Sequence, residues 1–89
     1  MREVVLTAAE CRDKESLHRY LAEQLSFPEW YGNNLDALYE CLTDLREDMS
    51  IQVPDVEALE EQLGAYARRL MRVLVDASSE NPCVHLSAE

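Results

Sequence analysis

Four carboxylates recur along one short segment of the chain, at spacings that would place them on one face of a helix. Asp36, Glu40, Asp44 and Glu47 stand three or four residues apart, and residues at these spacings are neighbours on a helix surface. Paired carboxylates can serve as general acid and base, hold a metal ion, or present negative charge to a basic pocket. The segment therefore raises three alternatives: an enzyme, a metal site and a binding surface.

The first two alternatives have thin support in the sequence. An enzyme using Asp36 and Glu40 would need a cleft and a partner base, and no motif supplies either. There is no Gly-rich phosphate loop, no GxSxG, and no nucleophile signature around a cysteine. A metal site built from Asp36, Glu40 and Asp44 lacks the ExxH pairing of carboxylate-bound metals. We therefore expect no catalytic residue, no metal and no cofactor.

A helix must position these acids. Asn33 or Asn34 can cap a helix that runs to about Leu45. At about 100° per residue, its leucines gather on one side, and the four acids gather with Tyr39 and Thr43 on the other. Like charges four residues apart destabilise a helix by ~0.2–0.5 kcal/mol per pair, which favours a use for these acids. The plainer interpretation is a solvated helix face.

An aromatic pair lies in the loop before this helix. Trp30 and Tyr31 precede Gly32 and follow Pro28, and such punctuation predicts a loop. Aromatic side chains at the edge of a charged surface are typical binding anchors. The alternative is that they cover the core, and we expect this for one of the two.

The remaining chain predicts a small α/β fold. Short β-branched runs predict three strands, and capping residues with apolar stripes predict four helices. The strands are expected at 3–6, 50–53 and 83–86, and the helices at 14–25, 33–45, 55–63 and 65–79. Strands joined by helical crossovers lie parallel. We expect one domain, residues 1–89, with a three-stranded parallel sheet packed with four helices in the order β-α-α-β-α-α-β.

The charge balance limits the kinds of partner. Eighteen acids against eight Lys and Arg give a formal net charge of −10, which repels nucleic acid and anionic membranes and attracts basic proteins. An acidic surface can also serve solubility alone. The three cysteines form no CxxC pair, so free thiols are favoured over a disulfide framework or a zinc site. No run approaches a bilayer span, and the N-terminus is unlike a signal peptide. We expect a cytoplasmic protein that is monomeric when free.

Residues 27–43, FPEWYGNNLDALYECLT, resemble the signature of the barstar family, whose members inhibit ribonucleases inside the cell. The upstream pair Leu17-His18 and the downstream Cys83 fit as well. The resemblance is close over 17–43 and looser after Asp44. It implies the fold predicted above and a second helix that enters the active site of a guanyl-preferring ribonuclease.

The resemblance also implies roles for single residues. Trp30 and Tyr31 would contact the rim of the ribonuclease, and Asn34 and Leu35 would line the loop contact. Carboxylates would stand in for phosphate oxygens, with Glu40 near the substrate phosphate site. The complete expected surface is Trp30, Tyr31, Asn34, Leu35, Asp36, Tyr39, Glu40, Thr43, Asp44 and Asp76.

Three positions depart from the best-known pattern of that family. Glu40 stands in place of Asp, Asp44 in place of Gly, and Leu45 in place of Trp. These changes bear on the identity of the partner, which could be a barnase-like ribonuclease or the nuclease domain of a toxin. An acidic interaction module on the same fold, binding some other basic protein, is the alternative function.

Overall fold

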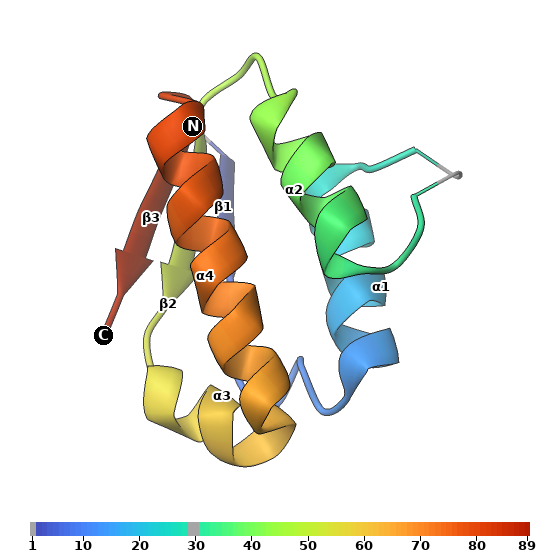
Figure 1. Ribbon diagram of the computed structural model, residues 1–89, viewed down its shortest axis with the longest axis vertical. Coiled ribbons are helices and arrows are strands. Elements are labelled where there is room, and N and C mark those ends of the chain that lie inside the picture. Colours follow the sequence, from blue (N-terminus) through green and yellow to red (C-terminus); the bar gives the residue numbers. More distant parts are fainter. Residues whose placement is uncertain (1, 29–30) are drawn as a thin grey trace.

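The computed structural model describes residues 2–28 and 31–89 and contains a three-stranded parallel sheet with four helices (Figure 1). The elements follow the predicted order. They are β1 (Arg2–Val5), α1 (Lys14–Leu25), α2 (Leu35–Thr43), β2 (Met49–Val53), α3 (Val56–Leu63), α4 (Ala65–Glu80) and β3 (Val84–Ala88). The predicted fold class is confirmed. Within the described ranges, no helix is long and apolar enough to span a bilayer.

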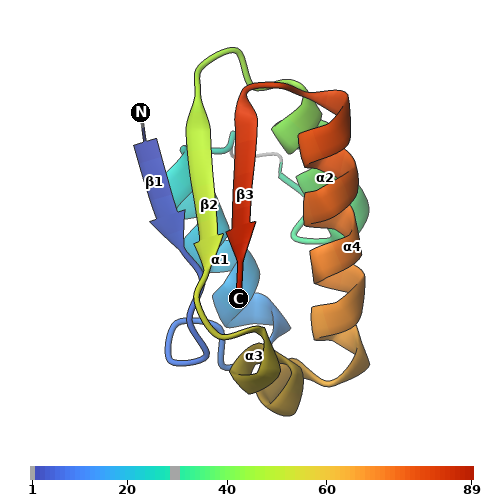
Figure 2. The same ribbon diagram turned by 90° about the vertical axis from the view of Figure 1, so that its left-hand side faces the viewer.

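The sheet has the strand order β1-β2-β3, and both neighbouring pairs are parallel. Because both crossovers step in the same direction and parallel crossovers are right-handed, their helices lie on the same side of the sheet. Figure 2 shows the sheet in front, with α1 and α2 behind it and α4 beside β3. Side chains along β2 accordingly alternate between buried and half-buried from Met49 to Val53.

The helix starts follow the capping residues that the sequence offered. Asp13 accepts a hydrogen bond from the Ser16 N–H at the start of α1, and Asp55 does the same for Ala58 in α3. Gly64 ends α3 with φ +63°, a backbone conformation that disfavours any side chain. These local signals explain why the predicted helix starts hold to within a residue or two.

The core is formed by the apolar faces that the sequence predicted for the helices and the sheet. The leucine stripe of α1, the leucines of α2, residues of α4 and alternate residues of β2 are buried in one core. The members include Leu17, Leu21 and Leu25; Leu35, Leu38 and Leu42; Leu70, Leu74 and Ala77; and Met49, Ile51 and Val53. Helix α2 packs chiefly on α4, so the surface beside their contact is formed jointly by these two helices.

Some element ends differ from prediction. Helix α2 ends at Thr43, with Asp44 as its C-cap, rather than near Leu45. The reason lies 38 residues away, because the side chain of Asn81 binds the carbonyl groups at this end. Strand β3 covers Val84–Ala88 rather than 83–86, since its ladder with β2 extends to Val53.

Candidate functional site

Three carboxylates from two helices converge on one hollow. Asp36 and Glu40 of α2 and Asp76 of α4 line an open depression of about 460 Å³ together with Tyr39 and Val73. We call it the acidic hollow. All three acids are solvent-exposed, and Tyr39 is half-buried. The structure thus brings together four of the predicted surface residues, including Asp76, which is 36 positions beyond Glu40 in the sequence.

The acids of the hollow form few ion pairs with the rest of the described chain. Among the residues that the structure describes, Asp36 and Glu40 form no salt bridge, and Asp76 lies 4.0 Å from Arg72 with both side chains largely exposed. An exposed pair of this kind contributes little to stability. The hollow therefore presents net negative charge that is available to a partner.

The start of α2 fixes the position of Asp36. Asn34 is the N-cap, and its side-chain oxygen accepts from the Ala37 N–H at 2.8 Å, while its amide donates to the Gly32 carbonyl at 3.2 Å. The helix dipole further favours Asp36 in the first turn. Asn34 is thus engaged within the chain, and its predicted contact with a partner stays a prediction.

Two other predicted residues lie beside or beyond the hollow. The Thr43 hydroxyl donates to the carbonyl of Tyr39 or Glu40, at 3.0 and 3.1 Å, so toward a partner its oxygen can only accept. Asp44 lines a separate hollow of about 200 Å³ with Phe27 and Pro28. Glu47 lies past the end of α2. The expected stripe of four acids on one helix is therefore wrong, because the helix stops before the last two.

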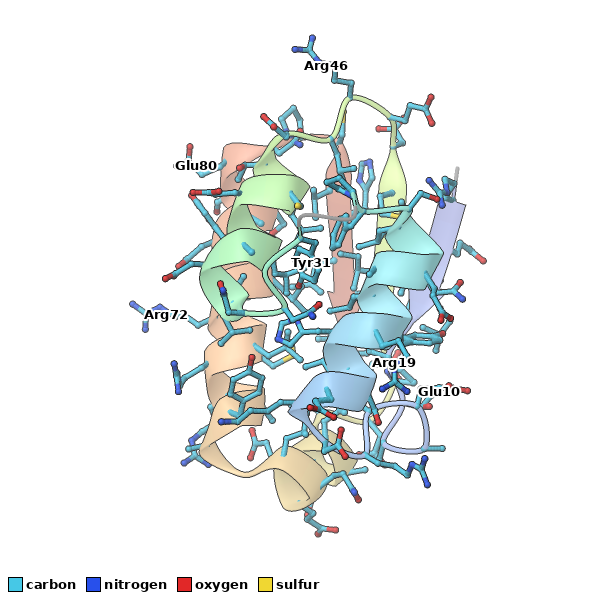
Figure 3. The ribbon with its side chains drawn as sticks, turned by 90° about the vertical axis from the view of Figure 1, so that its right-hand side faces the viewer. Glu10, Arg19, Tyr31, Arg46, Arg72 and Glu80 are labelled. Atoms are coloured by element: carbon cyan, nitrogen blue, oxygen red, sulfur yellow. The ribbon has the colours of Figure 1, made fainter. Side chains whose placement is uncertain are left out.

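One member of the aromatic pair, Tyr31, covers the core, as the core-covering alternative expected for one of the two. Tyr31 is only 6% exposed and lies between α1 and α2 (Figure 3). Trp30 falls outside the described residues, so its predicted role stays a prediction. Leu35 is likewise only 8% exposed. Tyr31 and Leu35 have little exposed surface left for a partner. Both side chains pack in the core beneath α2.

Tyr31 belongs to a polar chain that the sequence did not reveal. Its hydroxyl lies 2.6 Å from Nδ1 of His18, and Nε2 of His18 lies 2.6 Å from the Tyr66 hydroxyl. A neutral imidazole can donate one of these hydrogen bonds and accept the other. Burial lowers the pKa of His18 below its ordinary value and raises the pKa of Tyr31. The chain is therefore neutral near pH 7 and connects the loop before α2 to α4.

Asn81 holds the other end of α2. This side chain is 7% exposed, and its amide contacts the carbonyls of Leu42 at 2.9 Å, Leu45 at 2.9 Å and Thr43 at 3.3 Å. Its oxygen accepts from the Cys83 N–H at 3.0 Å. The carbonyls at the end of a helix lack hydrogen-bond donors within the helix. Asn81, at the end of α4, supplies such a donor to the end of α2.

A second hollow adjoins the first and was not predicted. Arg68, Arg69 and Arg72 of α4 line a depression of about 430 Å³ with Asp36 and Leu35, along with Ala65 and Val73. We call it the basic hollow. The available signal was three arginines within five residues near the start of a helix, where the dipole disfavours positive charge.

The described residues offer little support for a metal site or for a reactive cysteine. Among the residues placed by the structure, no three His, Cys, Asp or Glu side chains are grouped to hold a metal ion. All three cysteines are free thiols. The pKa of buried Cys11 is raised to about 11, chiefly by burial and secondarily by the charge of Glu10.

The comparison with protein families now bears on this surface. A family model described as "Barstar (barnase inhibitor)" matches residues 1–86. The chain belongs to the barstar family. A curated protein of Bacillus subtilis (strain 168), named "Putative ribonuclease inhibitor YrdF", is 33% identical over 81 residues, which cover 90% of this chain and 89% of that protein. Barstar-family proteins are inhibitors, and this membership sets aside the enzyme alternative for Asp36 and Glu40.

Proposed function

We propose that this chain inhibits a basic ribonuclease by placing α2 and the acidic hollow over the active site of that enzyme. The observation that carries the proposal is the convergence of Asp36, Glu40 and Asp76 on one open surface. A ribonuclease binds substrate phosphates with Arg, Lys and His side chains, and carboxylates on a rigid frame present similar oxygens to such groups. The inhibitor thereby occupies the phosphate sites.

The electrostatic argument extends beyond the hollow. A net charge of −10 accelerates encounter with a basic enzyme and disfavours competing polyanions. Glu40 is exposed near the middle of α2, away from the anchored ends of the helix, and we assign it the central contact. Tyr39 borders it as a half-buried ring that a partner would finish covering.

The remaining predicted contacts complete the proposed interface. Trp30 would reach the rim of the enzyme, Thr43 would accept a hydrogen bond, and Asp44 would extend the contact toward the loop that contains Phe27. We propose a guanyl-preferring, barnase-like ribonuclease or a toxin nuclease domain as the target, which would make the chain an immunity-type protein. We also propose a cytoplasmic monomer, which suits three free thiols.

Substitution of Glu40 tests the proposal. Glu40→Gln keeps the shape and removes the charge, and losing one charged contact in an interface costs about 2–5 kcal/mol, or roughly 30- to several-thousand-fold in Kd. Glu40→Lys should abolish inhibition of barnase or of another basic ribonuclease that the unsubstituted chain inhibits. The matched control is Glu61→Gln, on the exposed side of α3, with an equal change in charge.

Circular dichroism should be unchanged in all of these variants. Inhibition by Glu40→Lys equal to that of the unsubstituted chain would exclude the assigned surface. A folded chain that binds no ribonuclease, but reproducibly binds another basic protein through Glu40, would favour the acidic interaction module instead.

A further inference from the structure

The surface between α2 and α4 has two halves of opposite charge. The acidic hollow and the basic hollow share Asp36 and Val73, so they form one continuous surface. Moving along α4, the lining side chains change from Arg68 and Arg72 to Asp76. A partner seated over Glu40 would therefore also meet the arginines.

The positive charge of the chain is concentrated near the basic half, and one of the arginines there, Arg69, is held in place. The chain has only eight Lys and Arg, and four of them gather around Tyr66 or in the basic hollow. Lys14 Nζ lies 4.9 Å from the centroid of the Tyr66 ring, and Arg69 Cζ lies 5.6 Å from it. The Tyr66 hydroxyl is fixed by buried His18 at 2.6 Å. Cations held over a ring lose less freedom when a partner binds.

The arginines have a cost within the free protein. Arg68 and Arg69 lie within the first two turns of α4, where the helix dipole disfavours positive charge. They also weaken the overall attraction of an acidic chain to a basic enzyme. The ion pair with Asp76 accounts for Arg72 in part. Arg68 forms no salt bridge among the described residues, so its position beside the acidic hollow favours a contact with a partner.

We propose that the basic hollow binds carboxylates on the rim of the same ribonuclease whose active site receives the acidic hollow. The inference rests on the proposed function and narrows the target: it must have acidic side chains beside its basic centre. Such pairing of both signs gives specificity, because a ribonuclease with a basic rim would meet Arg68 and Arg72 with like charge. RNA is a poorer occupant, since Asp36 lines the same hollow and the chain is strongly negative.

The double substitution Arg68→Ala and Arg72→Ala distinguishes this proposal from the alternative that only the net negative charge of the chain matters. It changes the net charge from −10 to −12 and frees Asp76 from Arg72. If only negative charge mattered, association with barnase, or with another basic ribonuclease that the unsubstituted chain inhibits, would become faster and tighter. If the basic hollow binds rim carboxylates, the Kd rises by about 2- to 30-fold, as expected for two partly exposed ion pairs.

The matched control is the double substitution Arg12→Ala and Arg19→Ala, which changes the charge equally. Arg19 lies on α1, on the side away from Arg72 (Figure 3). The measurement is the association rate and Kd for the ribonuclease that the unsubstituted chain inhibits, at low and moderate salt. Weaker binding by the Arg68/Arg72 variant, with equal or tighter binding by the control, supports the proposal.

Three other outcomes are distinguishable. If the Arg68/Arg72 variant binds as tightly as the control while Glu40→Gln weakens binding, the basic hollow has no such role and the proposed function stands. If Glu40→Gln also has no effect, the proposed inhibitory surface itself is wrong. Binding of the free inhibitor to a labelled RNA, lost in the Arg68/Arg72 variant, would overturn the carboxylate assignment in favour of phosphate.

Discussion

The buried amide of Asn81 offers the sharpest test of how the fold holds α2. Asn81→Asp keeps the volume of the side chain and the oxygen that accepts from the Cys83 N–H. It removes the donor that faces the carbonyls of Leu42, Thr43 and Leu45. The substitution therefore isolates the contact with the end of α2.

The geometry sets the magnitude. Two amide hydrogens serve the contacts at 2.9 Å to Leu42 and Leu45, and each lost hydrogen bond costs about 0.5–1.5 kcal/mol. A carboxylate that is nearly buried against three carbonyl oxygens adds repulsion and desolvation. We expect the free energy of unfolding to fall by about 2–4 kcal/mol, which for a domain of this size lowers Tm by roughly 10–30 °C.

Urea denaturation followed by circular dichroism measures this loss. The matched control is Ser79→Asp, which adds the same charge at an exposed position of the same last turn and should cost under about 1 kcal/mol through the helix dipole. An Asn81→Asp variant no less stable than Ser79→Asp would refute the reasoning. The inhibition assay adds a second readout, because fraying of α2 should weaken ribonuclease binding although Asn81 lies outside the acidic hollow.

Two further predictions concern buried groups. The folded protein holds the pKa of His18 below its ordinary value of 6.5, so the unfolded chain binds a proton at His18 first as the pH falls. The free energy of unfolding should therefore decrease below about pH 6.5, by at most about 1.4 kcal/mol per pH unit. In urea titrations from pH 8 to 5, the His18→Gln variant should lack this part of the pH dependence. An equal slope in both proteins would contradict the assignment. The pKa of Cys11 is near 11, so about one-thousandth of this thiol is thiolate at pH 8. A disulfide reagent should therefore modify Cys41 and Cys83 well before Cys11. Equal rates for all three thiols would argue against the burial of Cys11.

The position of α2 and its acids could be predicted from local sequence. Asn34 as N-cap and leucines at helical spacing determine where the helix begins and which face is buried. Those signals act over a few residues, so they are readable without a structure. They leave Asp36 and Glu40 exposed, and both line the acidic hollow.

Long-range contacts were beyond such reasoning. No local pattern indicates that Asn81 reaches carbonyls 36 to 39 residues earlier, and so the end of α2 was placed too late. The burial of Tyr31 depends on His18, which α1 presents from 13 residues away. The basic hollow needs α2 and α4 side by side, and only the packing of the two helices shows it.

The dependence of α2 on distant residues also suits this helix to the inhibitory role that we propose for it. A helix of nine residues is too short to be stable in water by itself, and Asp36 and Glu40 repel each other along it. The surrounding structure compensates: Asn34 caps its start, Tyr31 binds buried His18 before it, and Asn81 binds its end. Because the backbone of α2 is already held in the free protein, a ribonuclease that binds its carboxylates has little ordering of the helix to oppose it. Affinity should therefore respond to these anchors as well as to the acids themselves.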